Sequence, residues 1–189
     1  MFQASTEKKV AVFLADGFEE IEALTVVDLL YRAGIPVTTV SIGEEREVVS
    51  SHEITVKANT TIGALDFAQY DMIVLPGGMP GTIHLKECQA LTEQVSAFHR
   101  AGKPLAAICA APTILAELGL LEGKPATCFP DMEPQMKGAV LTHGAVAVTD
   151  DRIITGRGMG CAIPFSLAIV AYYLGQETAD LLAGKIVYE

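Results

Sequence analysis

The sequence predicts one doubly wound α/β domain, in which helices cover both faces of a mainly parallel sheet. First, apolar stretches of strand length alternate with segments of helical periodicity. Second, a helix-to-strand junction, with a Gly followed two residues later by Pro, occurs at 33–37, 101–105 and 122–126. Third, the 189 residues are 50% hydrophobic and no linker divides them, so we expect a single domain over 1–189 with a polar tail at about 1–8.

The first half of the chain is expected to begin with a strand at Lys9–Ala15, a continuous β-rich run that suits burial on both faces. The next element is a helix at Glu19–Ala33, whose first turn is acidic and whose last turn carries Arg32, in keeping with the helix dipole. Three further β segments follow, namely a strand from Val37, a weaker β pair within Glu47–Val56 and a strand at Asp71–Leu75.

The second half continues the alternation. We expect a long helix at about Thr82–Arg100 and a buried strand at Pro104–Ile108. A hairpin should pair Ala145–Thr149 with Arg152–Thr155 around Asp150 and Asp151. The remaining helices are expected at Ala110–Leu118, Ala162–Leu174 and Thr178–Ala183.

Composition excludes several classes of protein. The chain has 13 Lys+Arg against 23 Asp+Glu, a net charge of -10, so nucleic acid is not expected as a partner. No apolar run approaches the roughly 20 residues of a membrane span, and the first nine residues lack an apolar signal core. The four cysteines are widely spaced, as expected where thiols stay reduced. We therefore expect a soluble cytoplasmic protein.

Open α/β sheets place their sites at the carboxyl ends of the strands, so the strand-to-helix loops are the segments to search. The glycine loop at Gly156–Gly160 is similar to a dinucleotide fingerprint, but the third glycine would fall at Cys161. No phosphate-binding loop motif occurs anywhere in the chain. We expect no cofactor.

Cys109 follows the buried strand directly and is flanked by small residues, with Pro112 suited to a first helical turn. This arrangement is typical of a nucleophile elbow, and the helix N-terminus should favour the thiolate. The alternative is a buried cysteine that ends a strand, and spacing alone does not decide between them. For the other cysteines a packing role is expected, with Cys88 early in the long helix, Cys128 at a strand end and Cys161 at a helix start.

A thiolate needs an acid/base partner and a group that stabilises negative charge. The histidines are expected to lie away from the strand ends, and none has metal-ligand spacing, so no metal is expected: His52, His84, His99 and His143. Acidic residues just after the first strand remain, namely Glu19, Glu20 and Glu22, and compensation of the helix dipole accounts for one or two of the three. Glu22 should point inward with a raised pKa, because it shares a helix face with apolar residues. Gly77 and Gly78 offer exposed backbone N–H groups for an oxyanion.

Several of these motifs together resemble the DJ-1 (ThiJ/PfpI) superfamily over nearly the whole chain. They are Ala15–Glu22, Val74–Gly78, Ala106–Pro112, Thr155–Gly158 and Leu167–Val170. PfpI-type peptidases have His directly after the cysteine. This chain has Ala110 at that position, which resembles the DJ-1-like branch. The resemblance implies a flavodoxin-like homodimer with Cys109 as nucleophile. It also implies a protonated Glu22 as acid/base, and an oxyanion site at the N–H groups of Gly78 and Ala110, beside Gly77.

Members of this branch are described as glyoxalase III-like hydro-lyases and deglycases that need no cofactor. The resemblance thus implies cysteine-dependent handling of reactive dicarbonyls, either methylglyoxal converted to lactate or adducts removed from proteins and nucleotides, in carbonyl and oxidative stress defence. The alternative is a redox sensor or chaperone that acts through oxidation of Cys109 without turnover. Peptidase activity is not expected, because Cys109 lacks an obvious neighbouring His. A thiamine-related role has no supporting phosphate site in the sequence.

The sequence departs from the superfamily pattern around the expected site. Phe129 stands where many animal members carry His, and Met159 replaces the usual Pro. Arg32 retains one member of an anion-binding pair whose companion position is His52. Together with Glu19, these residues are the candidates for the substrate pocket.

Overall fold

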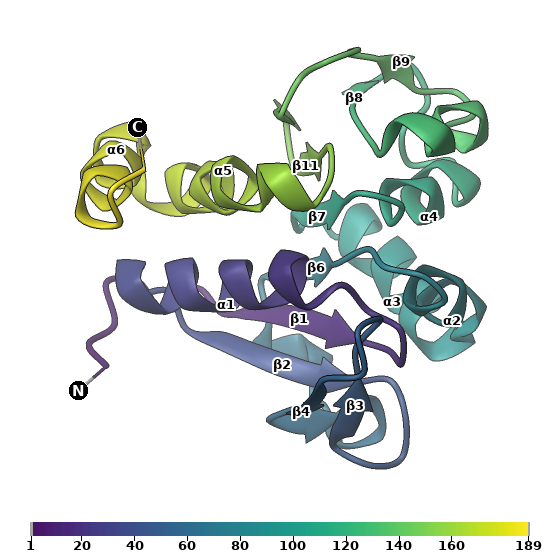
Figure 1. Ribbon diagram of the computed structural model, residues 1–189, viewed down its shortest axis with the longest axis horizontal. Coiled ribbons are helices and arrows are strands. Elements are labelled where there is room, and N and C mark those ends of the chain that lie inside the picture. Colours follow the sequence, from purple (N-terminus) through teal and green to yellow (C-terminus); the bar gives the residue numbers. More distant parts are fainter. Residues whose placement is uncertain (1, 189) are drawn as a thin grey trace.

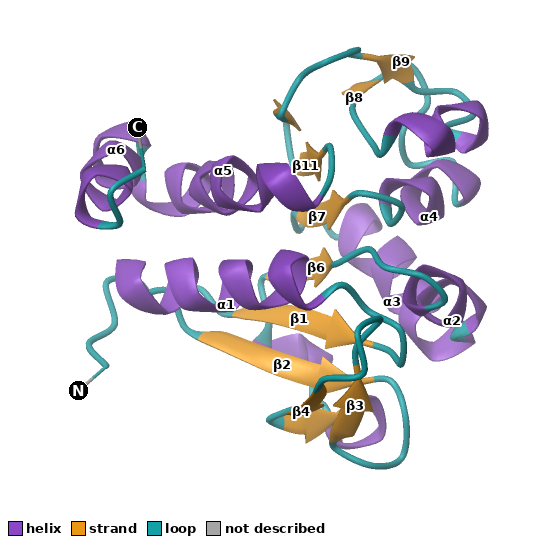
Figure 2. Ribbon diagram, viewed as in Figure 1, coloured by secondary structure: helices purple, strands orange, loops and turns teal. Residues whose placement is uncertain are grey.

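A seven-stranded sheet lies between two layers of helices in the computed structural model, which describes residues 2–188 (Figure 1) (Figure 2). All neighbouring strands of this sheet pair in parallel, except the two that come last in the chain, which form an antiparallel hairpin at one edge. In spatial order the strands are β10 (Ala147–Asp150), β11 (Ile153–Gly156), β7 (Leu105–Ile108), β6 (Met72–Leu75), β1 (Val10–Leu14), β2 (Val37–Ser41) and β5 (Thr60–Thr61).

The central strand β1 shows why the sheet is buried on both faces. Val10, Val12 and Leu14 point into one apolar cluster, while Ala11 and Phe13 point into the other, as the two-residue period of a strand requires. The order β2-β1-β6-β7-β11 is the flavodoxin-like order of doubly wound folds. The predicted fold class is confirmed.

Each face of the sheet has its own set of helices. One face packs against α1 (Glu20–Ala33), α5 (Ala162–Leu174) and α6 (Gln176–Lys185). The other face packs against α2 (Gly81–Glu87), α3 (Gln89–Arg100) and α4 (Pro112–Glu117). Among residues 2–188 we find no helix with the length and apolar character that a membrane crossing requires.

Smaller elements decorate the sheet. The predicted β pair is confirmed as β3 (Glu47–Val49) and β4 (Thr55–Lys57), and the predicted hairpin as β10 and β11. A second small sheet joins β8 (Pro125–Ala126) to β9 (Val140–Leu141), and 3₁₀ turns occupy Ile62–Ala64, Phe67–Gln69, Pro130–Gln135 and Met159–Cys161. The N-terminal tail lies against the end of α1, where the Phe2 and Tyr31 rings are 4.8 Å apart and the Ser5 N–H donates to the Gly34 carbonyl.

The single helix predicted over Thr82–Arg100 is wrong, because the chain breaks at Cys88 into α2 and α3. Leu85 and Leu91 are both buried in the same apolar cluster. On one straight helix at about 100° per residue they would lie about 120° apart around the axis. The extended backbone of Cys88 allows both leucines to face the sheet.

Two of the three predicted junctions are confirmed. Gly34 and Gly102 have φ of 76° and 72° where α1 and α3 end, shortly before β2 and β7. The third junction is wrong, because α4 already ends at Glu117 and Gly123 follows a series of turns. The strand after Gly123 is the two-residue β8, which lies outside the main sheet.

Candidate active site

Cys109 occupies a strained turn at the carboxyl end of β7. Its φ is 64°, in the left-handed region that non-glycine residues rarely adopt. The Ala111 N–H donates to the Ile108 carbonyl across the turn, and α4 begins only at Pro112, two residues later than expected. This is the geometry of a nucleophile elbow, which lifts a side chain above the edge of the sheet.

Glu22 lies beside this elbow, on the first turn of α1. Its side chain is only 1% exposed, and its Oε2 accepts a hydrogen bond of 2.8 Å from the Gly77 N–H. A Cβ atom at Gly77 would lie 2.7 Å from both the Cys109 Cβ and Glu22 Oε2. Glycine at position 77 therefore permits the close approach of the thiol and the carboxyl.

The pKa of Glu22 is raised to about 7, chiefly because burial disfavours its charged form. Interaction with the Cys109 thiol and the Gly77 N–H opposes that rise, while the Glu19 charge adds to it. The other oxygen, Oε1, is buried and accepts no hydrogen bond of regular geometry within residues 2–188. The predicted inward orientation and raised pKa of Glu22 agree with the structure.

The pKa of the Cys109 thiol is raised to about 12, first by burial and then by the neighbouring Glu22 carboxylate. Two backbone N–H groups, those of Ala110 and Gly78, act in the opposite direction. The Ala110 N–H, at the start of the helical segment, does favour the thiolate as expected, but the net shift of the pKa is upward. Burial and a like charge outweigh the backbone donors.

The loop after β6 supplies the candidate oxyanion donors. The N–H groups of Gly78 and Ala110 are the backbone donors that lower the pKa of the Cys109 thiol. Gly78 has φ 91° and packs so tightly that a Cβ would lie 2.3 Å from the Glu19 nitrogen. The Gly77 N–H is already bound to Glu22, so the expectation that it also serves an oxyanion is wrong.

Two of the predicted pocket residues lie around the elbow. The Phe129 N–H donates to the Cys109 carbonyl at 2.8 Å, and the Phe129 ring packs beside Gly158. Phe129 and the adjacent Met159 are both exposed. Together they give the surroundings of the elbow an apolar rim.

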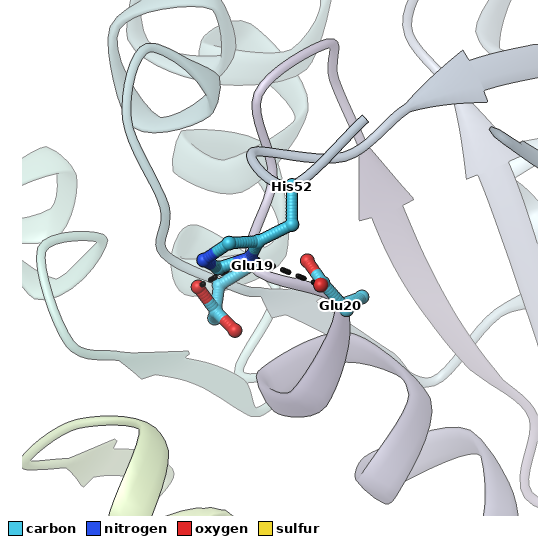
Figure 3. Close-up of side chains that lie close together, drawn as sticks. All are labelled: Glu19, Glu20 and His52. Carbon is cyan, nitrogen blue, oxygen red and sulfur yellow. Dashed lines mark ion pairs between the residues drawn. The ribbon is translucent and has the colours of Figure 1, made fainter. Parts of the chain in front are cut away.

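The predicted anion-binding pair of Arg32 and His52 is not formed within this chain. Arg32 binds Asp28 near the end of α1, about 15 Å along the helix from Glu22 at 1.5 Å per residue. His52 Nδ1 instead lies 2.9 Å from Glu20 Oε1 and 3.9 Å from Glu19 Oε2 (Figure 3). A pocket that contains both Arg32 and Cys109 is therefore not supported.

The expectation that every histidine lies away from the strand ends is also wrong. His84 Nδ1 lies 2.8 Å from the Asp16 carbonyl, just beyond β1, and His52 contacts the start of α1. The loop after β3 and the start of α2 fold over this edge of the sheet, although they are distant from it in sequence. Spacing along the chain gave no signal for these contacts.

The four cysteines are free thiols with different surroundings. Cys128 is buried, and burial raises its pKa to about 11. Cys88 lies at the break between α2 and α3, and Cys161 caps α5. Cys109 alone among them lies in a left-handed turn beside a buried carboxyl.

A strained cysteine paired with a buried carboxyl, at the carboxyl edge of a doubly wound sheet, defines an α/β protein with a cysteine elbow. Comparison with known proteins identifies the group within this class. A sequence model of the DJ-1/PfpI family matches residues 8–172, and the chain belongs to that family.

Individual relatives agree with this assignment. The chain is 36% identical to protein DJ-1 homolog B of Arabidopsis thaliana over 97% of its length, but it spans only 42% of that relative. It is 34% identical to protein dj-1beta of Drosophila melanogaster, covering 93% of this chain and 95% of the relative. The solved structure of oxidized DJ-1 from Toxoplasma gondii superimposes with a TM-score of 0.91 at 35% identity, over 96% of this chain and 98% of that one.

One bacterial relative is named as a protease rather than as a DJ-1 protein. YraA of Bacillus subtilis (strain 168), which carries a cysteine protease name, is 30% identical over 79% of this chain and 89% of its own length.

Proposed function

We propose that this protein is a cofactor-independent enzyme that detoxifies reactive dicarbonyls, converting methylglyoxal to lactate or removing the corresponding adducts from proteins and nucleotides. The observation that carries the proposal is that Cys109 and the buried Glu22 carboxyl lie side by side across Gly77, and that each shifts the pKa of the other. Membership of the DJ-1/PfpI family supports it. We further propose that the protein acts as a homodimer in the reducing cytoplasm, in defence against carbonyl and oxidative stress.

The chemistry begins with the proton that the two groups share. When Glu22 is ionised it can accept the thiol proton as the sulfur attacks, and a carboxyl with a pKa of about 7 is suited to exchange protons near neutral pH. Once Glu22 carries the proton, its charge no longer opposes the thiolate. Burial and proximity thus make the pair a nucleophile with its own acid/base.

The reaction then balances without an external oxidant. Cys109 sulfur bonds to the aldehyde carbon of methylglyoxal, and the resulting oxyanion receives hydrogen bonds from the N–H groups of Gly78 and Ala110. Glu22 gives the thiol proton to this oxyanion and is ionised again. It then moves a proton from the aldehyde-derived carbon to the neighbouring carbon, while the hydroxyl proton passes to the neighbouring oxygen, which leaves the thioester of lactate. Water hydrolyses the thioester, restores the thiol and releases lactate. The aldehyde carbon of methylglyoxal is oxidised to the level of a carboxylic acid, and the neighbouring ketone carbon is reduced to an alcohol.

The proposal is tested by replacing Cys109 with Ser and measuring lactate formed from methylglyoxal. We expect a loss of at least ~10³-fold, because the nucleophile is removed. Cys88→Ser is the matched control, since Cys88 lies at a helix break, and its rate should stay within about twofold. An unchanged rate in Cys109→Ser would refute the proposal.

A second candidate function is redox sensing through Cys109. The N–H groups of Gly78 and Ala110 oppose the rise in the pKa of the Cys109 thiol, and the same donors are suited to bind the oxygens of a sulfinate. Peroxide treatment, mass spectrometry of the Cys109 peptide and the methylglyoxal assay distinguish the two functions. Oxidation at Cys109 in a chain without turnover would favour the sensor. Peptidase activity is not proposed, because the acid/base group beside Cys109 is a carboxyl rather than a histidine.

A further inference from the structure

A second cluster of polar side chains lies at the start of α1, outside the Cys109–Glu22 pair. Glu19 and Glu20 come from the N-terminal end of the helix, and His52 reaches them from the loop between β3 and β4 (Figure 3). One donor atom from each residue, an imidazole nitrogen and two carboxylate oxygens, lies within 4.8 Å of the other two. Nitrogen and oxygen donors in this combination are those that bind zinc and similar divalent metals.

The backbone holds this cluster in place. The Ser51 N–H donates to the Phe18 carbonyl at 2.8 Å, which fixes the loop of His52 directly beside the start of α1. The Ser51 hydroxyl donates to Glu19 Oε2 at 3.3 Å and so orients that carboxylate. Hydrogen bonds of this kind, made to ligands by their neighbours, are what orient the ligands of metal sites.

One atom of the cluster lacks a partner. Glu20 is only 8% exposed, and its Oε2 is buried without any hydrogen-bond partner among the residues described. A buried carboxylate oxygen in that condition is costly, because it has left water without compensation. The same carboxylate faces His52 through Oε1 (Figure 3). A cation that bound Glu20 through both carboxylate oxygens would give Oε2 the partner that it lacks.

The distances fit a metal with a small adjustment. Zinc bonds of about 2.0–2.1 Å in a tetrahedral site place ligand atoms about 3.4 Å apart. His52 Nδ1 lies 2.9 Å from Glu20 Oε1 and 3.9 Å from Glu19 Oε2, so the two distances bracket this value. Metal binding would displace the proton that His52 shares with Glu20. The two carboxylates and the resulting neutral imidazole then carry two negative charges, which a divalent cation neutralises.

We propose that Glu19, Glu20 and His52 form a site for a divalent transition metal, with Zn²⁺ as the representative ion and solvent in the remaining position. No metal was expected from the sequence, because Glu20 and His52 lie 32 positions apart and show no metal-ligand spacing. The proposal is independent of the proposed dicarbonyl activity, since Cys109 takes no part in the site.

The chain contains a natural control for this cluster. His143 Nδ1 lies 3.2 Å from a Glu133 carboxylate oxygen, so it forms a similar exposed histidine–glutamate pair. That pair is not part of any group of three potential ligands found within residues 2–188. Loss of His143 should therefore leave metal binding unchanged if three converging ligands are required.

The test is calorimetric titration of Zn²⁺ into the chelator-treated full chain carrying Cys109→Ser, which removes the reactive thiol as a competing ligand. We expect one Zn²⁺ per chain. In the same background His52→Gln and Glu20→Gln should each weaken binding by about tenfold or more, whereas His143→Gln should stay within about twofold. Co²⁺ in place of Zn²⁺ should give a spectrum without a thiolate charge-transfer band.

Two results would overturn the proposal. One is the absence of stoichiometric Zn²⁺ binding in the parent chain, and the other is equal binding in the parent and in His52→Gln. Urea unfolding of each variant shows that it is folded. If Glu20→Gln does not fold, His52→Gln decides the question alone, because that side chain is 63% exposed and its loss leaves the core intact.

Discussion

Glu20 and Glu22 are two buried carboxyls in the first turn of the same helix, yet their surroundings affect them in opposite ways. Burial raises the pKa of Glu22 to about 7, because the Cys109 thiol and a single N–H group compensate only part of the cost. Burial also acts to raise the pKa of Glu20, but its own backbone N–H, His52 and Ser50 together hold that pKa below the usual value.

Depth and partners together decide which carboxyl exchanges protons, because Glu22 lies deeper than Glu20 and has fewer groups that stabilise its charge. Glu22 has few groups that stabilise its charge, so it can gain and lose a proton near neutrality. Glu20 has a cationic partner and remains an anion. One helical turn thus carries an acid/base group and a fixed negative charge side by side.

The largest expected effect is on turnover. Replacing Glu22 with Gln keeps the shape of the side chain but removes proton exchange, so lactate formation from methylglyoxal should fall by about 10²–10⁴-fold. The exposed Glu87→Gln, at the end of α2, is the control and should change the rate by less than about twofold. An equal rate in Glu22→Gln and wild type would show that the carboxyl has no catalytic role.

The next effect is on stability, with opposite signs for the two carboxyls. Because the folded-state pKa of Glu22 is raised from 4.5 to about 7, its contribution is most favourable below pH 4.5 and is lost as the pH rises through 7. Above pH 7 the loss is about 3 kcal/mol. Glu22→Gln should therefore raise the free energy of unfolding at pH 8 by up to about 3 kcal/mol and change it little at pH 4.

For Glu20 the effect of pH on the free energy of unfolding has the opposite sign. Its folded-state pKa is lowered, so its stabilisation is present above pH 4.5 and is lost as the pH falls through the lowered value. Glu20→Gln should lower the free energy of unfolding at pH 8 by about 1 kcal/mol. Urea unfolding of both variants at two pH values measures these differences, and shifts of the same sign would contradict the comparison.

A smaller effect is expected from the glycine that brings Glu22 to the thiol. A Cβ at position 77 would meet both partners at 2.7 Å, so Gly77→Ala should destabilise the fold by about 1–3 kcal/mol and reduce turnover. Gly63→Ala is the matched control, because nothing lies within 4 Å of a Cβ there. Equal stability of the two variants would mean that the Cys109–Glu22 approach is looser than described.

Much of this architecture could be predicted from the sequence, because it follows from local patterns. Apolar runs of strand length identified β1, β6 and β7, and the small residues with Pro112 located the elbow. Glu22 could be placed inward because it shares a helix face with apolar residues. These features depend on neighbours a few residues away.

The remaining features depend on contacts between distant segments. The break at Cys88 allows Leu85 and Leu91 to face the same side of the sheet. The pKa of Cys109 is raised by burial and by Glu22, which lies 87 positions earlier in the chain. The position of His52 beside Glu20 is set by a loop that docks on Phe18. Periodicity and spacing carry no information about such docking.

The pH dependence of Cys109 alkylation tests the central claim, the shared proton of Cys109 and Glu22, most directly. Iodoacetamide labelling of the Cys109 peptide can be followed by mass spectrometry from pH 5 to 10, with the Cys88 peptide as internal reference. In wild type the rate should rise through a midpoint near pH 7 as Glu22 ionises and becomes able to accept the thiol proton. In Glu22→Gln this midpoint should be absent, and identical profiles in the two proteins would contradict the account.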